Sequence, residues 1–128
     1  MKKTSTHHVT VKRDIVLTGE NIDDIMTTAL EGGINYWCCK AEVVENEYYG
    51  EYASEQISRG GSLRLYDSED DEVYILTLDK FLRGFKMACE NDYPPIWLEG
   101  NEVECSYIDA CEADTIVQYA VFGELVYG

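Results

Sequence analysis

Residues 62–89 read SLRLYDSEDDEVYILTLDKFLRGFKMAC, and this stretch decides which fold the sequence predicts. Its first five residues alternate polar and apolar side chains, as a half-buried strand does. The acidic run 67–72 predicts a turn, and residues 73–78 return as the second strand of a hairpin. The apolar spacing then becomes helical, with Thr77 or Asp79 as the N-cap. The stretch therefore predicts an antiparallel hairpin followed by an amphipathic helix.

The chain before this stretch predicts two further strands and one further helix. Residues 9–17 place Val, Ile and Leu side chains on one parity, which predicts a half-buried strand. Thr18 follows as the N-cap of an amphipathic helix, which Gly32–Gly33 end. Residues 34–44 are rich in aromatic and β-branched side chains and predict a long strand. Residues 45–61 predict a loop or a short irregular helix.

The chain after this stretch predicts an irregular segment and a last helix. Residues 91–108 contain both prolines, and residues 102–106 predict a short strand within them. Asp109 and Glu112 have the spacing of a capping box for the last helix. Consecutive strands joined by short turns favour an antiparallel sheet covered by helices. We therefore expect the α+β class, in two layers, with an antiparallel sheet of about four strands and about three helices packed on one face.

Length and composition predict one folded domain, residues 1–128. The chain has 128 residues, of which 45% are hydrophobic and 12% aromatic, which argues against a disordered chain. No apolar run approaches the ~20 residues that cross a membrane, and no apolar stretch of a secretory signal follows the first basic residues. We expect a cytoplasmic protein with no membrane partner.

The cysteines and histidines do not form a recognisable catalytic or metal-binding motif. The five cysteines show no two-residue gap of a zinc or thioredoxin-type site, so buried reduced thiols are expected, with a disulfide or metal site as the minor alternative. His7 and His8 are adjacent, and no nucleophile elbow, phosphate loop or dinucleotide fingerprint is present. We predict that the protein is not an enzyme and uses no cofactor.

The strongest signal in the composition is acidity. The chain carries 25 acidic and 10 basic side chains, a formal net charge of −15. One interpretation is solubility alone, and the other is attraction to a basic surface, such as a groove that normally holds nucleic acid. Direct binding of DNA or RNA is disfavoured, because contacts to phosphates need clustered Lys and Arg.

Residues 32–61 combine aromatic, amide and glycine residues with a single arginine, which is a pattern typical of a ligand-binding wall. Rings stack on flat ligands, amides bind polar edges, and a guanidinium binds phosphate or carboxylate through two hydrogen bonds. The alternative is structural: Tyr36 and Trp37 fill opposite faces of a strand, and Gly60–Gly61 only turn the chain. The candidate ligand-binding residues are Asn35, Tyr36, Trp37, Tyr52, Gln56 and Arg59.

The acidic turn does not have the ligand pattern of a calcium-binding loop, because it lacks the central glycine and the distal glutamate. A solvated hairpin tip is the simpler interpretation. As part of an acidic surface, the tip is also a candidate contact for a basic partner. The residues concerned are Asp67, Glu69, Asp70, Asp71 and Glu72.

Three stretches of the chain resemble a known group of proteins: TTALEGGINYWC (27–38), GEYASEQISRGGSLRLYD (50–67) and ADTIVQYAVFGELVYG (113–128). They are similar to those of small acidic proteins encoded by bacteriophages, prophages and mobile elements. The resemblance implies an accessory protein inside a bacterial host cell that antagonises immunity by binding, without chemistry.

Two binding mechanisms fit this context. The first is a sponge that sequesters a nucleotide immune signal at the six candidate residues, near the interface of a homo-oligomer; it ranks first because those residues otherwise have no role. The second is an inhibitor resembling an anti-CRISPR protein, whose acids at 67–72 and 90–104 occupy the nucleic-acid groove of a basic host defence protein. A plain structural accessory domain comes third, and an enzyme that degrades a nucleotide signal comes fourth.

Overall fold

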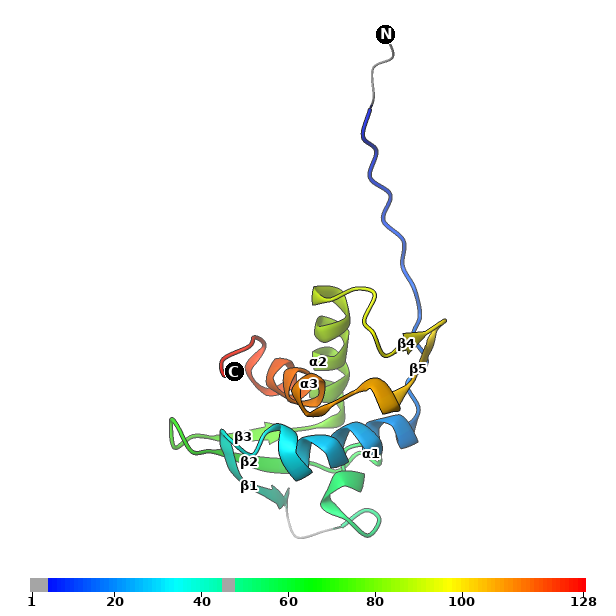
Figure 1. The fold of residues 1–128 in the computed structure, drawn as a ribbon. Helices are drawn as coiled ribbons and strands as arrows, with labels where there is room; N and C mark the ends of the chain where they lie inside the picture. Colours follow the sequence, from blue (N-terminus) through cyan, green and yellow to red (C-terminus); the bar gives the residue numbers. More distant parts are fainter. Residues whose placement is uncertain (1–4, 45–47) are drawn as a thin grey trace.

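The computed structural model describes residues 5–44 and 48–128, and within them it confirms the predicted α+β class. A three-stranded antiparallel sheet has the order β1-β2-β3, and a separate two-stranded sheet pairs β4 with β5. In Figure 1, α2 and α3 cross next to one another, with α1 and the larger sheet below them. The α-helices are α1 (Gly19–Thr28), α2 (Leu78–Asn91) and α3 (Ala110–Phe122). The strands are β1 (Cys38–Val43), β2 (Leu63–Asp67), β3 (Val73–Leu76), β4 (Leu98–Glu99) and β5 (Glu102–Val103).

The first helix begins and ends as local chemistry dictates. Thr18 accepts a hydrogen bond from the Asn21 backbone N–H (3.0 Å), and the Asn21 side chain accepts one from the Thr18 backbone N–H (3.0 Å). The helix then widens into the π-helical turn η1 (Ala29–Gly33). A Cβ at Gly33 would lie 2.8 Å from the carbonyl oxygen of Ala110, so only glycine lets η1 approach the start of α3 this closely.

The predicted strand at 34–44 begins later than expected. The backbone N–H of Cys38 donates to the carbonyl of Ile34 (2.8 Å), so residues 34–37 form a turn and β1 starts at Cys38. Tyr36 and Trp37 therefore do not lie on opposite faces of a strand. The predicted loop at 45–61 contains the 3₁₀ turn η3 (Ala53–Glu55), while residues 45–47 lie outside the described part of the chain.

The hairpin of β2 and β3 has one buried and one open face. Cross-strand partners share a face, and Leu63, Leu65 and Leu76 are fully buried on the one that the helices cover. Tyr74 lies on the same face and packs edge-on against Phe122 of α3, with 4.8 Å between ring centroids. The packing of helices on one face, with the hairpin and helix predicted from residues 62–89, is confirmed.

Helices α2 and α3 pack closely because α2 carries a glycine at their crossing. A Cβ at Gly84 would lie 2.5 Å from the backbone nitrogen of Ala120 and 2.7 Å from the carbonyl oxygen of Ile116. Phe81 and Val117 are fully buried in the same core. The predicted caps are also present, since Thr77 accepts from the N–H of Lys80.

The predicted strand at 9–17 is wrong. Val9 and Val11 are 82% and 79% exposed, and only Val16 makes a β-bridge, to Glu102. The backbone N–H of Val16 donates to the carbonyl of Asn101 (2.6 Å), and residues 5–14 extend away from the body (Figure 1). Alternation shows that a segment is able to pair, but pairing also needs a free strand edge within reach. The short strand expected at 102–106 is confirmed only as β5.

The sequence also predicts no membrane-spanning segment and buried, reduced cysteines. In the two described ranges, every helix is too short or too polar to cross a bilayer. All five cysteines are free, and Cys38 and Cys89 are buried as expected. Cys39 and Cys111 are exposed, so the expectation of buried thiols is wrong for these two.

Candidate functional site

A buried carboxylate, Asp114, lies behind a surface groove and organises the side chains around it. Asp114 is 8% exposed and lies on α3, whose first turn is capped by Asp109. One of its oxygens accepts hydrogen bonds from Trp37 Nε1 (2.8 Å) and Gln118 Nε2 (2.9 Å). Its other oxygen accepts from the hydroxyl of Tyr36 (2.6 Å). Burial, together with this last bond, raises the pKa of Tyr36 to about 12.

Gln118 fastens the C-terminal segment to α3. Its side-chain oxygen accepts from the backbone N–H groups of Val126 (2.8 Å) and Tyr127 (2.9 Å). Gly123, with φ of 77°, ends the helix in the left-handed conformation and lets the chain fold back. The Tyr127 ring stacks on Trp37 with 5.8 Å between centroids, and its hydroxyl donates to Asp67 (2.7 Å).

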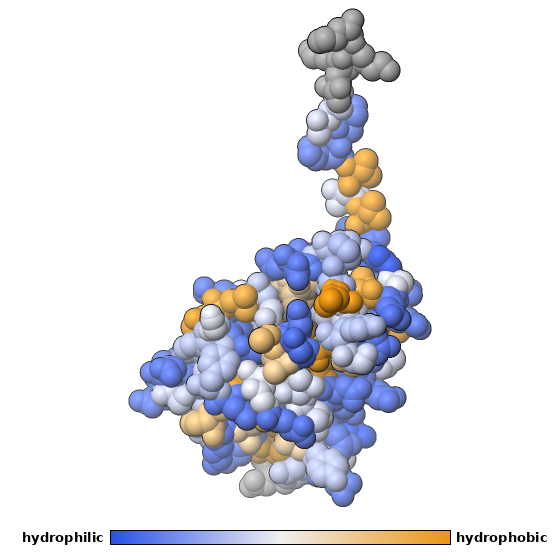
Figure 2. Space-filling model, viewed as in Figure 1, coloured by the Kyte–Doolittle hydropathy of each residue, from blue (hydrophilic) through white to orange (hydrophobic). Residues whose placement is uncertain are grey.

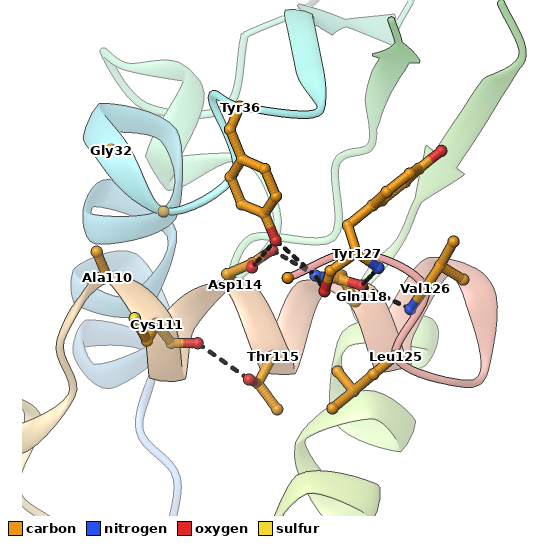
Figure 3. A pocket seen from close by; sticks show the side chains of 12 residues that line it. Gly32, Tyr36, Ala110, Cys111, Asp114, Thr115, Gln118, Leu125, Val126 and Tyr127 are labelled. Atoms are coloured by element: carbon orange, nitrogen blue, oxygen red, sulfur yellow. Dashed lines mark hydrogen bonds between the residues drawn. The ribbon is translucent and has the colours of Figure 1, made fainter. Parts of the chain in front are cut away.

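These elements enclose an open groove of about 640 Å³. Its walls are the end of η1 at Gly32 and Gly33, Tyr36, residues 110–118 of α3 and the C-terminal residues 125–128. Figure 3 shows the Tyr36 hydroxyl pointing to Asp114 and Gln118, with Cys111 toward one end and Leu125 and Val126 toward the other.

The groove offers few groups for chemistry. Asp114 is already engaged by three donors, and the Thr115 hydroxyl donates to the carbonyl of Cys111 in its own helix (3.0 Å). Among the described residues, the lining of the groove contains no histidine, lysine or arginine. An anionic group entering the groove would meet carboxylate and π surface rather than a cation. The groove therefore suits a neutral or cationic group better than a phosphate.

The structure divides the six candidate ligand-binding residues between two places. Tyr36 lines the groove, Trp37 lies fully buried behind it, and Asn35 is exposed beside them. The other three belong to the loop at 48–61, which does not line the groove.

In that loop, polar side chains act on their own neighbours. Gln56 is fully buried, accepts from the Tyr49 N–H (2.8 Å) and donates to the carbonyls of Tyr49 (2.9 Å) and Tyr52 (2.8 Å). Arg59 pairs with Glu55 (2.9 Å) and lies 3.9 Å from a carboxylate oxygen of Asp23. The ring of Tyr52 is exposed. These contacts give Gln56 and Arg59 a role in shaping the loop.

Asp114, Gln118 and Tyr127 are not among the site residues predicted from the sequence. A signal was present, because Asp114 and Gln118 are polar residues four apart within the last apolar helix. On a helix that spacing places two side chains on one face, which here is buried.

The acidic hairpin tip is ordered by its own side chains. Asp70 accepts from the N–H of Glu72 (2.9 Å) and from the hydroxyl of Tyr74 (2.7 Å). The bond from Tyr74 holds the pKa of Asp70 below its usual range, and the same bond raises the pKa of Tyr74 to about 12. Asp71 takes a left-handed φ of 58°, and residues 69–72 are all exposed.

Asp67 differs from the rest of the acidic candidates. It is 2% exposed and accepts hydrogen bonds from Tyr127 (2.7 Å) and from the Glu69 N–H (2.8 Å). The prediction that Asp67 contributes to an exposed acidic surface is therefore wrong, because this carboxylate is turned inward to hold the tip and the C-terminal segment.

Few of the acids are neutralised by the protein itself. Within residues 5–44 and 48–128, three basic residues form ion pairs, and they engage three acids. Lys40 and Arg64 both contact Glu42, while Arg59 contacts Glu55 and Asp23. The same part of the chain holds no cluster of three or more side chains suited to a metal ion.

Comparison of the chain with known proteins found no matching family model, no similar curated protein and no similar solved structure.

Proposed function

We propose that this protein acts by binding, without catalysis, and that its partner is a basic, nucleic-acid-binding protein whose nucleic-acid groove it occupies. The observation that carries the proposal is the excess of acid that the protein leaves unneutralised. Of its 25 acidic residues, all except Glu45 and Glu47 lie in the described ranges, which leaves 23, and three of these 23 form ion pairs. Such a surface repels nucleic acid and attracts the surfaces that bind it.

The hairpin tip is the best-defined part of this surface. Glu69, Asp70, Asp71 and Glu72 project from a turn that the Asp67 and Asp70 side chains hold in place. A fixed tip loses less conformational entropy on binding than four acids on a flexible loop. Charge complementarity of this kind raises association rates by about 10- to 1,000-fold at low salt.

The geometry gives less support to a nucleotide sponge. The guanidinium of Arg59 is already shared by two carboxylates, and the described residues that line the groove beside Tyr36 include no basic side chain. The sponge stays a prediction with its own test. A stoichiometric nucleotide released by heat, and lost from a folded Arg59→Ala variant, would replace the present proposal.

The resemblance to phage and mobile-element proteins supplies the context of the proposal. Bacterial immune complexes that hold guide RNA or target DNA present basic grooves, which are the partner chemistry proposed here. An acidic inhibitor of such a complex is therefore the function that we propose.

The proposal is tested by displacement of labelled DNA from a panel of purified bacterial defence complexes. The variant E69Q/D71N/E72Q removes three charges and keeps Asp70, which orders the tip; asparagine also tolerates the left-handed backbone at position 71. Its matched control, E20Q/D24N/E31Q, removes the same charge from three exposed acids along α1 and η1.

The expected result is that the wild type and the control displace DNA from at least one complex, while the tip variant needs about tenfold more protein. Equal potency of the two triple variants would contradict a role for the tip. Failure of the wild type on every complex would contradict the proposed function.

A further inference from the structure

The N-terminal arm, residues 5–14, is an extended segment that the body does not cover. Val9 and Val11 are the most exposed large apolar side chains described, at 82% and 79%. Figure 2 shows apolar side chains standing along this arm, clear of the body. The base of the arm is fixed, because Arg13 donates to the hydroxyl of Tyr93 (2.9 Å) and to the carbonyl of Gly100. β-Branched residues in an extended segment favour strand pairing once a free sheet edge is available.

The larger sheet has a matching open edge at β3. The N–H of Asp67 donates to the carbonyl of Glu72 (2.9 Å), so these two residues form a hydrogen-bonded pair of the hairpin ladder. Hydrogen-bonded and non-hydrogen-bonded pairs alternate from there, which makes Val73 and Ile75 members of non-hydrogen-bonded pairs with β2. By the alternation of an antiparallel ladder, Val73 and Ile75 then direct their N–H and C=O groups to the outer edge. The contact from Lys80 Nζ to the carbonyl of Ile75 (2.8 Å) agrees with this direction.

We infer that the arm of one copy adds as an antiparallel strand to the β3 edge of a second copy. Val9 then lies opposite Ile75, and Val11 opposite Val73. This register joins the arm's two exposed valines to two apolar side chains that are 36% and 44% exposed on the open face. It also satisfies the outward-pointing backbone groups of β3, since a carbonyl that already accepts from Lys80 has a second lone pair.

Charge complementarity favours pairing of the basic arm with the acidic body of a second copy, in the register that places Val9 opposite Ile75. Residues 1–14 hold four basic side chains and one acidic one, a net of +3, while residues 15–128 hold six basic and 24 acidic, a net of −18. The register places Lys12 opposite Glu72, at the end of the acidic tip. Two arms pairing with each other would instead bring like charges together, which disfavours an arm–arm dimer.

The inference is tested by sedimentation of the full chain over about 10 μM to about 1 mM, a range suited to a small interface. The expected result is an average mass that rises above that of one chain as the concentration increases, because each copy carries both an arm and a β3 edge. Val11→Pro removes an N–H that the register uses and weakens association about tenfold or more. Thr10→Pro, whose N–H points away from β3 in this register, changes it by about twofold or less.

Exchange of charge tests the register itself. Lys12→Glu is expected to weaken association about two- to fivefold, and the double variant K12E/E72K to restore it. Stronger association of Lys12→Glu, with no effect of Glu72→Lys, would indicate arm–arm pairing and overturn the inference. A wild-type chain that stays monomeric throughout, or equal effects of the two proline variants, would overturn it as well.

Discussion

Replacing Asp114 by alanine tests whether the buried network holds the groove together. The substitution leaves three donors without their acceptor: Trp37 Nε1, Gln118 Nε2 and the Tyr36 hydroxyl. Trp37 is fully buried, so its N–H is left without a partner, which costs about 1–3 kcal/mol. Gln118 keeps the carbonyl of Tyr127 (3.1 Å), and the half-exposed Tyr36 is able to reach water, so each adds about 0.5–1 kcal/mol.

Part of this cost is offset, because the variant no longer buries a carboxylate. We therefore expect Asp114→Ala to lower the free energy of unfolding by about 2–4 kcal/mol. Asp114→Asn keeps one acceptor for Trp37 and Gln118, and its cost is expected to be about 1 kcal/mol. Thr115→Ala is the matched control, since its hydroxyl bonds only within α3, and its cost is expected to stay below about 0.5 kcal/mol.

The assay is urea unfolding monitored by tryptophan fluorescence. The urea concentrations at the midpoint are compared between variants whose unfolding free energy has the same dependence on urea. A loss for Asp114→Ala below about 1 kcal/mol, or one equal to that of Thr115→Ala, would show that the Asp114 network does not stabilise the fold.

Two further predictions concern helix packing and alkaline stability. Gly84→Ala is expected to lower the free energy of unfolding by about 1–3 kcal/mol, because its Cβ would lie 2.5 Å from the backbone nitrogen of Ala120. Gly32→Ala is the control and should be nearly neutral, because its Cβ would have no heavy atom within 4 Å. Equal stabilities of the two variants in thermal or urea unfolding would exclude the close crossing of α2 and α3. Folding raises the pKa of Tyr36 and Tyr74 from 10.0 to about 12, so the stability linked to them is fully present below pH 10 and is lost as the pH rises through 12. Ultraviolet titration is expected to show Tyr36 and Tyr74 ionising near pH 12, and ionisation of both near pH 10 would count against their hydrogen bonds.

The parts of the fold that sequence predicts are those whose determinants are local. The hairpin and α2 follow from alternation, an acidic turn and a Thr cap, all within residues 62–91. The cap of α1 at Thr18 and the stop after Gly32–Gly33 are equally local. In each case, side chains a few residues apart decide the structure.

The parts that sequence does not predict depend on distant contacts. Residues 9–17 have the alternation of a strand, but only Val16 finds an edge to pair with. Trp37 is drawn into the core by Asp114, a residue 77 positions away. The aromatic side chain of Trp37 is compatible with a ligand-binding site and with core packing. The hydrogen bond to Asp114 decides between them, and the residues near Trp37 in the sequence do not reveal it.

The candidate site also depends on contacts that the local sequence does not reveal. Gln56 and Arg59 have the residue types of a ligand-binding site, but their partners are backbone groups and carboxylates of the protein itself. The acidic tip was located correctly because a run of charges rarely lies inside a fold. Asp67, the first residue of that run, lies inside because Tyr127 donates to it from the far end of the chain.

We propose that unneutralised acid drives binding to a basic nucleic-acid groove. The decisive measurement is the rate at which the protein displaces labelled DNA from a defence complex between about 0.05 and 0.3 M salt. We expect the rate to fall at least about tenfold over this range for the wild type, and less steeply for E69Q/D71N/E72Q. A rate that does not change with salt, and is the same for both proteins, would contradict it.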